Sequence, residues 1–82
     1  MSENRLAVIS IIVEDREKSG EINGLLSAFG EYIIGRLGLP YSKKEVAVMC
    51  IVIDAPVEVT NNLTGKIGMI SGVTAKTLFS KV

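Results

Sequence analysis

The sequence predicts an α+β fold, with a four-stranded antiparallel sheet and two helices on one of its faces, and three observations support this. Residues 46–53, Val-Ala-Val-Met-Cys-Ile-Val-Ile, form an uninterrupted apolar run. Residues 6–13 form a second run, broken by a single serine. Each run is followed by a segment with helical periodicity. Short runs that are apolar on both side-chain parities are typical of central strands covered on both faces.

The first strand is expected at residues 6–13, and the first helix follows it. Four charged residues end the strand, and the second of them, Asp15, is placed to accept free backbone amides as a helix N-cap. The helix should extend from about Arg16 or Glu17 to Phe29. Its apolar stripe has spacings of three and four and consists of Ile22, Leu25, Leu26 and Phe29.

Pairs of glycines interrupt both predicted helices. Gly20 and Gly24 each cost about 1 kcal/mol relative to Ala, which we interpret as a sign of close approach by another backbone or by a ligand. In the second helix, Gly65-Lys66-Ile67-Gly68 fits a tight contact with the sheet. The same four residues fit a GXXG clamp for nucleic acid, but they lie within a helical pattern and not between two helices.

Residues 32–37 alternate weakly and predict an edge strand, with Ile33 and Leu37 on one side and Arg36 on the other. The polar, turn-rich residues 38–44 should join this strand to the central apolar run as a hairpin.

The second helix and the last strand complete the chain. Asp54-Ala55-Pro56 should end the central strand, because Pro56 suits the first turn of a helix. The buried stripe of that helix consists of Val59, Leu63, Ile67 and Ile70. Residues 73–79 alternate as a strand, with Val73 and Phe79 facing inward.

The resulting order, strand, helix, strand, strand, helix, strand, is the ferredoxin-like arrangement. Right-handed crossovers around both helices place the first and third strands in the middle and give the sheet order 4-1-3-2. These are the two strands that are apolar on both faces. The local pattern and the topology therefore agree.

Two helices cover only one face of this sheet. The other face carries Leu6, Val8 and Ile12 beside one parity of residues 46–53, a patch on the order of 300 Å² in projection. Soluble monomers rarely expose apolar patches of several hundred Å². We therefore expect a homodimer or homotetramer with that face or an edge strand in the interface; a monomer with an open apolar face is the alternative.

Composition excludes several function classes. Nine basic and nine acidic residues cancel and no window concentrates the basic ones, so direct nucleic-acid binding is not expected. No apolar run approaches the ~20 residues of a membrane span, and the first residues do not resemble a signal peptide. The single cysteine, Cys50, is expected to be a small apolar residue of the core. We expect a soluble, cytoplasmic protein without a membrane partner.

Few residues of the sequence are suited to catalysis or to metal binding. The chain has no histidine, which excludes histidine-centred triads and histidine-rich metal sites. Carboxylates at residues 14–17 are adjacent, but charges at such a corner usually form a solvated helix start. Gly65-Lys66 lacks the upstream glycine and the following hydroxyl of a P-loop. We expect no enzyme activity, no cofactor and no metal site.

Three segments carry a family resemblance that covers nearly the whole chain. Residues 13–18 (Val-Glu-Asp-Arg-Glu-Lys), 63–68 (Leu-Thr-Gly-Lys-Ile-Gly) and 70–77 (Ile-Ser-Gly-Val-Thr-Ala-Lys-Thr) resemble the small ACT-like proteins described as candidate regulators of the iron-only hydrogenase system. The chain is more distantly similar to ACT domains and to the ligand-sensing domain of the nickel-responsive repressor. The resemblance implies one ACT-like, oligomeric regulatory domain over residues 1–82.

The resemblance also implies a place for a small-molecule effector. ACT domains typically hold one between subunits, at the loop after the first strand and the start of the first helix. In this chain that region contains Glu14, Asp15, Arg16, Ser19, Gly20 and Asn23. The Pro-Gly pair usual in amino-acid-binding ACT loops is absent, as are the histidines of the nickel site.

Two function hypotheses follow. In the first, an oligomeric sensor binds a small effector at the subunit boundary and changes a partner. In the second, a structural adaptor without a small-molecule ligand docks its apolar face on another protein.

Overall fold

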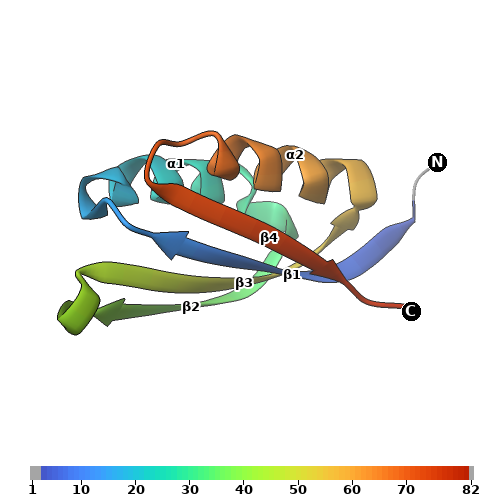
Figure 1. Cartoon of the computed structure of the whole chain (residues 1–82). Helices are drawn as coiled ribbons and strands as arrows, with labels where there is room; N and C mark the ends of the chain where they lie inside the picture. The colour runs from blue at the N-terminus through green and yellow to red at the C-terminus, as the bar shows by residue number, and fades with distance from the viewer. Residues whose placement is uncertain (1–2, 82) are drawn as a thin grey trace.

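The computed structural model describes residues 3–81 in two layers, a sheet with two helices on one face (Figure 1). The strands are β1 (Asn4–Val13), β2 (Ile33–Tyr41), β3 (Val46–Pro56) and β4 (Val73–Phe79), and the helices are α1 (Ser19–Ala28) and α2 (Val57–Gly68). Their order in the sheet is β2-β3-β1-β4, with antiparallel pairing throughout. This is the predicted order 4-1-3-2 read from the other edge, so the ferredoxin-like fold is confirmed. Residues 1–2 and 82 of the predicted domain lie outside the described part.

Two strands are longer than the sequence pattern predicted. β3 does not stop at Asp54, because Asn4, Arg5 and Leu6 of β1 pair with its last three residues. β2 continues through Gly38–Tyr41 and pairs with the start of β3. Pro40 is tolerated there because β2 is an edge strand, where a missing amide leaves no neighbour unpaired. The hairpin turn is therefore short and consists of the 3-10 turn η3 (Ser42–Lys44) and Glu45.

The first helix begins later than expected. Arg16–Lys18 form a 3-10 turn, η1, and α1 starts at Ser19. Asp15 is the N-cap of η1, with its Oδ1 accepting the Glu17 amide at 3.1 Å. The predicted capping role of Asp15 is thus confirmed, at a 3-10 turn in front of the helix. Among the described residues, neither helix is long and apolar enough to cross a membrane.

The core lies between the helices and one parity of the central strands. It consists of Ala7, Ile9, Ile11 and Val13 of β1, Ile51, Ile53 and Ala55 of β3, Ile22 and Leu26 of α1, Leu63 and Ile67 of α2, and Val73 of β4. Directly paired residues of antiparallel strands point to the same side, so the register places Ile9 beside Ile51 and Ala7 beside Ile53.

The helix glycines do not make the expected close contacts with another backbone segment of this chain. A Cβ built on Gly20, Gly24, Gly65 or Gly68 would meet no other part of the chain within 4 Å, and all four residues are exposed. Gly65 and Gly68 therefore allow no closer approach of α2 to the sheet, although Ile67 between them is fully buried in the core. The four glycines lie on the outer surface of the helix layer, where the helix pattern alone does not distinguish them from packed positions.

Thr60 of α2 is fully buried, and its Oγ1 has no hydrogen-bond partner among the described residues. Thr60→Val keeps the shape and removes the unpaired hydroxyl, so we expect a stability gain of about 1 kcal/mol, measured by urea unfolding. The matched control is Thr64→Val. The Thr64 hydroxyl donates to the Thr60 carbonyl at 2.9 Å and pairs with Thr77 of β4, so this variant should lose stability. A Thr60→Val protein less stable than wild type contradicts the assignment.

Candidate functional site

The sheet face opposite the helices is apolar and uncovered. Its register pairs place seven large apolar side chains there, each at least 39 % exposed. We call this surface the open face; its exposed apolar residues are Leu6, Ile12, Leu37, Leu39, Tyr41, Val48 and Leu78. Ser10, Asp54, Thr74 and Lys76 are its polar members. The predicted uncovered face is present, and it extends further along the strands than predicted because β2 and β3 are longer.

Cys50 lies on the open face and not in the core. It pairs with Ser10 of β1 and Leu37 of β2 and is half-buried. The prediction that it is a core residue is wrong, because only the parity of β3 that contains Ile51 and Ile53 faces the helices. Both parities of this strand are apolar, so the sequence did not distinguish them.

A hollow of about 710 Å³ lies at the hairpin end of the open face. Its lining residues are Ile12, Glu14, Leu39, Tyr41, Lys44, Val46 and Val48. Apart from Glu14 and Lys44 the lining is apolar or aromatic. The hollow belongs to the same surface as the open face and extends it around the end of β1.

A smaller, more polar groove lies between the start of α1 and the helix-facing side of β2. The groove measures about 230 Å³ and is lined by Arg16, Ser19, Asn23, Arg36, Gly38, Leu39, Pro40, Ala47, Val48 and Met49. Arg36 Nη2 donates to Asn23 Oδ1 at 2.6 Å and joins the helix to the strand. We call this site the α1–β2 groove.

Three of the six predicted site residues meet in this groove, namely Arg16, Ser19 and Asn23. The other three lie elsewhere. Glu14 lines the hollow on the open face. Gly20 is exposed and lines none of the described pockets.

Asp15 has a structural role in the backbone around it. Besides capping η1, it lies against the loop before β4, where the Gly72 carbonyl accepts the Glu14 amide at 2.7 Å. Asp15 therefore positions the turn that carries Arg16.

Arg36 was not among the predicted site residues, because the resemblance pointed only to residues 14–23, and a β-bulge places it in the groove. Between Ile33 and Gly35 the register of β2 against β3 shifts, so that Ile34 is an extra residue. The shift places Arg36 opposite Ile51 on the helix side, and Ile33 and Leu37 end up on opposite faces. The predicted arrangement, with Ile33 and Leu37 on one side, is wrong for this reason. Gly35 is the one signal of the bulge in the sequence.

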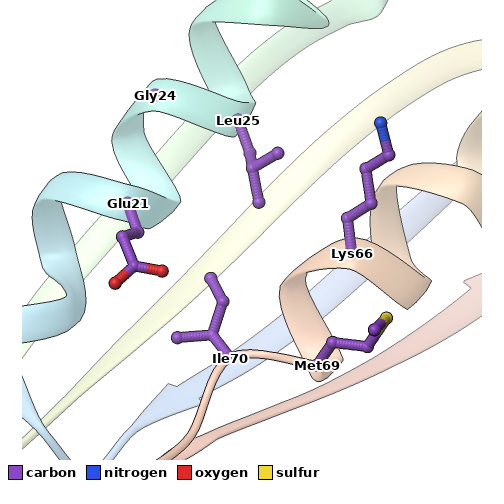
Figure 2. Close-up of a pocket in the computed structure, with 6 residues that line it drawn as sticks. All are labelled: Glu21, Gly24, Leu25, Lys66, Met69 and Ile70. Atoms are coloured by element: carbon purple, nitrogen blue, oxygen red, sulfur yellow. The ribbon is translucent and has the colours of Figure 1, made fainter.

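A third depression lies on the helix layer, between α1 and the end of α2 (Figure 2). It measures about 500 Å³ and is lined by Glu21, Gly24, Leu25, Lys66, Met69 and Ile70. Figure 2 shows the Leu25 and Ile70 side chains in the space between the two helices. Lys66 Nζ lies 5.9 Å from the centroid of the Phe29 ring, and Glu21 pairs with Lys18 at 3.6 Å. We call it the helix-layer groove.

Comparison with known proteins identifies the family. The model of the TM1266-like family, described as a candidate iron-only hydrogenase system regulator, matches residues 5–77. The chain belongs to the TM1266-like family. The structure of the uncharacterized protein TM1266 from Thermotoga maritima is similar to it, with a TM-score of 0.91 and 39 % identity over 96 % of this chain and 100 % of that one. The family resemblance inferred from the sequence is confirmed.

The TM1266-like chain also resembles an ACT domain. The crystal structure of the ACT domain from the GTP pyrophosphokinase of Chlorobium tepidum matches with a TM-score of 0.76 and 24 % identity over 92 % of this chain and 99 % of that one. The solution structure of that domain matches with a TM-score of 0.72 and 24 % identity over 92 % and 86 %. These likenesses establish the ACT-like fold. No curated protein matches the sequence.

Proposed function

We propose that this chain is a homo-oligomeric, non-catalytic regulator in the iron-only hydrogenase system, that it binds a small effector in the α1–β2 groove, and that its assembly responds to the effector. One observation carries the proposal. Leu39 and Val48 line both the α1–β2 groove and the hollow on the open face. The hairpin of β2 and β3 is thus a thin wall between a candidate ligand site and a candidate interface.

A second copy of the chain is the proposed occupant of the open face, and the area of the face supports this. Strands about 4.8 Å apart that advance about 3.3 Å per residue give four strands of seven to eleven residues a face of roughly 450 to 700 Å². Stacking two such faces buries about 1,000 Å² in total, the size at which specific interfaces begin. A homodimer covers the open face of both copies, whereas a tetramer needs a further contact surface.

The hairpin shared by the two surfaces links ligand binding to assembly. A ligand that fits the groove better in one arrangement of the hairpin shifts the equilibrium toward that arrangement. Because Leu39 and Val48 belong to both surfaces, the same shift changes how the open face fits a partner copy. Linkage is reciprocal, so assembly must change ligand affinity by the same factor.

Native mass spectrometry on gently purified protein tests the proposal, because it reports subunit number and retained small molecules together. We expect a dimer or tetramer with added mass. In Asn23→Ala, which removes the partner of Arg36, the thermal shift produced by the retained molecule should disappear, and adding the molecule should no longer change the monomer–oligomer equilibrium. Asn61→Ala, an exposed residue of α2 outside the groove, is the control. A bare monomer at micromolar concentration contradicts the proposal.

The helix-layer groove favours a second candidate function, that of an adaptor for another protein without a small-molecule ligand. Met69 is 86 % exposed beside this groove, and Leu25 and Ile70 line it. A flexible exposed methionine next to an apolar depression is typical of adaptable binding surfaces. If no retained mass is found and Met69→Glu abolishes capture of a protein partner while the oligomer persists, the adaptor is the better description.

A further inference from the structure

The α1–β2 groove brings two guanidinium groups together without an acidic neighbour. Arg16 and Arg36 both line it, and its other lining residues are neutral. Within residues 3–81, neither arginine forms an ion pair with a carboxylate. In a chain with nine basic and nine acidic residues, this is a local excess of positive charge inside a concave site.

The orientation of Arg36 adds geometry to this charge. One nitrogen, Nη2, is held by Asn23 Oδ1 at 2.6 Å, which leaves the other N–H groups of the guanidinium for a ligand. A planar guanidinium held in place matches the two oxygens of a carboxylate or phosphate group. The Ser19 hydroxyl, also in the lining, can donate or accept at the same site.

We propose that the α1–β2 groove selects a small anion that carries a carboxylate or phosphate group, with Arg16 and Arg36 as its charge partners and Asn23 as the residue that positions Arg36. This inference rests on the proposed function and names the ligand class of its site. The volume of about 230 Å³ lies below the roughly 300–1,000 Å³ of pockets for drug-sized ligands. A groove of this size suits a small metabolite, and Gly38 and Pro40 line it beside the polar groups.

The test is an NMR titration of the full chain with three probes: inorganic phosphate, glutarate, and glutaramide, the neutral counterpart of glutarate. We expect phosphate or glutarate to shift the amide signals of Ser19 and Gly38, and glutaramide to have no effect. Binding should weaken as sodium chloride is added, because chloride screens and competes. A response to glutarate alone indicates a carboxylate ligand, and a response to phosphate alone indicates a phosphate ester.

Variants connect the response to the two arginines. Arg16→Gln and Arg36→Gln should each weaken anion binding by roughly 10- to 100-fold, as expected for loss of a charge-assisted hydrogen bond. Arg36→Lys keeps the positive charge but loses the planar guanidinium, so its affinity for the anion should lie between those of the wild type and Arg36→Gln. The control is Lys43→Gln, which removes an exposed cation at the hairpin turn, outside the groove. Both arginines are exposed, so the fold should be retained.

Three results overturn the inference: no shift with either anion, equal binding of glutaramide, or the same loss of affinity in Lys43→Gln as in Arg36→Gln. The outcome is separable from that of the proposed function. If native mass spectrometry finds an oligomer with a neutral ligand that Arg16→Gln and Arg36→Gln still bind, the proposed function stands and the anion inference fails. If the anions bind a protein that is monomeric at all concentrations, the anion inference stands and the proposed function fails.

Discussion

Replacing Leu37 and Leu78 with glutamate should convert the proposed homo-oligomer into a monomer. Both side chains lie on the open face, on the two outer strands, and are 68 % and 74 % exposed in the single chain. In stacked sheets each glutamate would become a buried, unpaired carboxylate, and the symmetry of a dimer doubles the number. We expect dissociation to become at least about a hundredfold more favourable, since one unpaired buried charge already costs several kcal/mol. Light scattering after size exclusion measures this.

The matched control is Met69→Glu. Met69 is more exposed than the two leucines, at 86 %, but it lies beside the helix-layer groove on the other side of the molecule. This variant should keep the oligomer. Cys50, near the middle of the open face, gives a second measure, because its alkylation should be slow in the oligomer and fast in the double variant. An oligomer that survives both glutamates rules out the open face as the interface.

Gly72→Ala should produce the largest loss of stability of any single substitution considered. Gly72 has a φ of 78°, in the left-handed region, and a Cβ there would lie 2.9 Å from the Asp15 Cβ. Its carbonyl accepts the Glu14 amide at 2.7 Å, so the loop cannot move away without breaking this bond. The left-handed conformation costs roughly 1–2 kcal/mol for a residue with a side chain, and overpacking adds typically 1–3 kcal/mol. We expect a total loss of about 2–5 kcal/mol in urea unfolding.

Two companion variants separate the causes. Asn tolerates left-handed backbone better than Ala, so the loss that remains in Gly72→Asn reports the collision with Asp15. Gly68→Ala places a methyl group on the exposed side of α2, where no other part of the chain lies within 4 Å, and it should gain up to about 1 kcal/mol. If Gly72→Ala is as stable as wild type, the assigned backbone contact between the two loops is wrong.

The strands, helices and their order follow from local patterns. Residues 6–13 and 46–53 are apolar on both parities, and the topology of two split β-α-β units makes these two strands central. The stripe of Leu63 and Ile67 predicted the buried face of α2, and both side chains are fully buried. Arg16, Ser19 and Asn23, which line the α1–β2 groove, were predicted from the resemblance to ACT domains, which points to the loop after the first strand and the start of the first helix.

Other features depend on pairing between distant segments. Periodicity reports alternation within one strand, but a bulge arises where two strands with unequal numbers of residues must stay hydrogen-bonded. The extra residue Ile34 exists only in the register of β2 against β3, and it determines that Arg36 reaches the α1–β2 groove. The same holds for β3. Its two apolar parities are equivalent in the sequence, and only the packing of Ile51 and Ile53 against the helices determined that Cys50 and Val48 face outward. Local chemistry therefore specified the elements and their order, whereas long-range hydrogen bonding and burial decided which side chains share a surface.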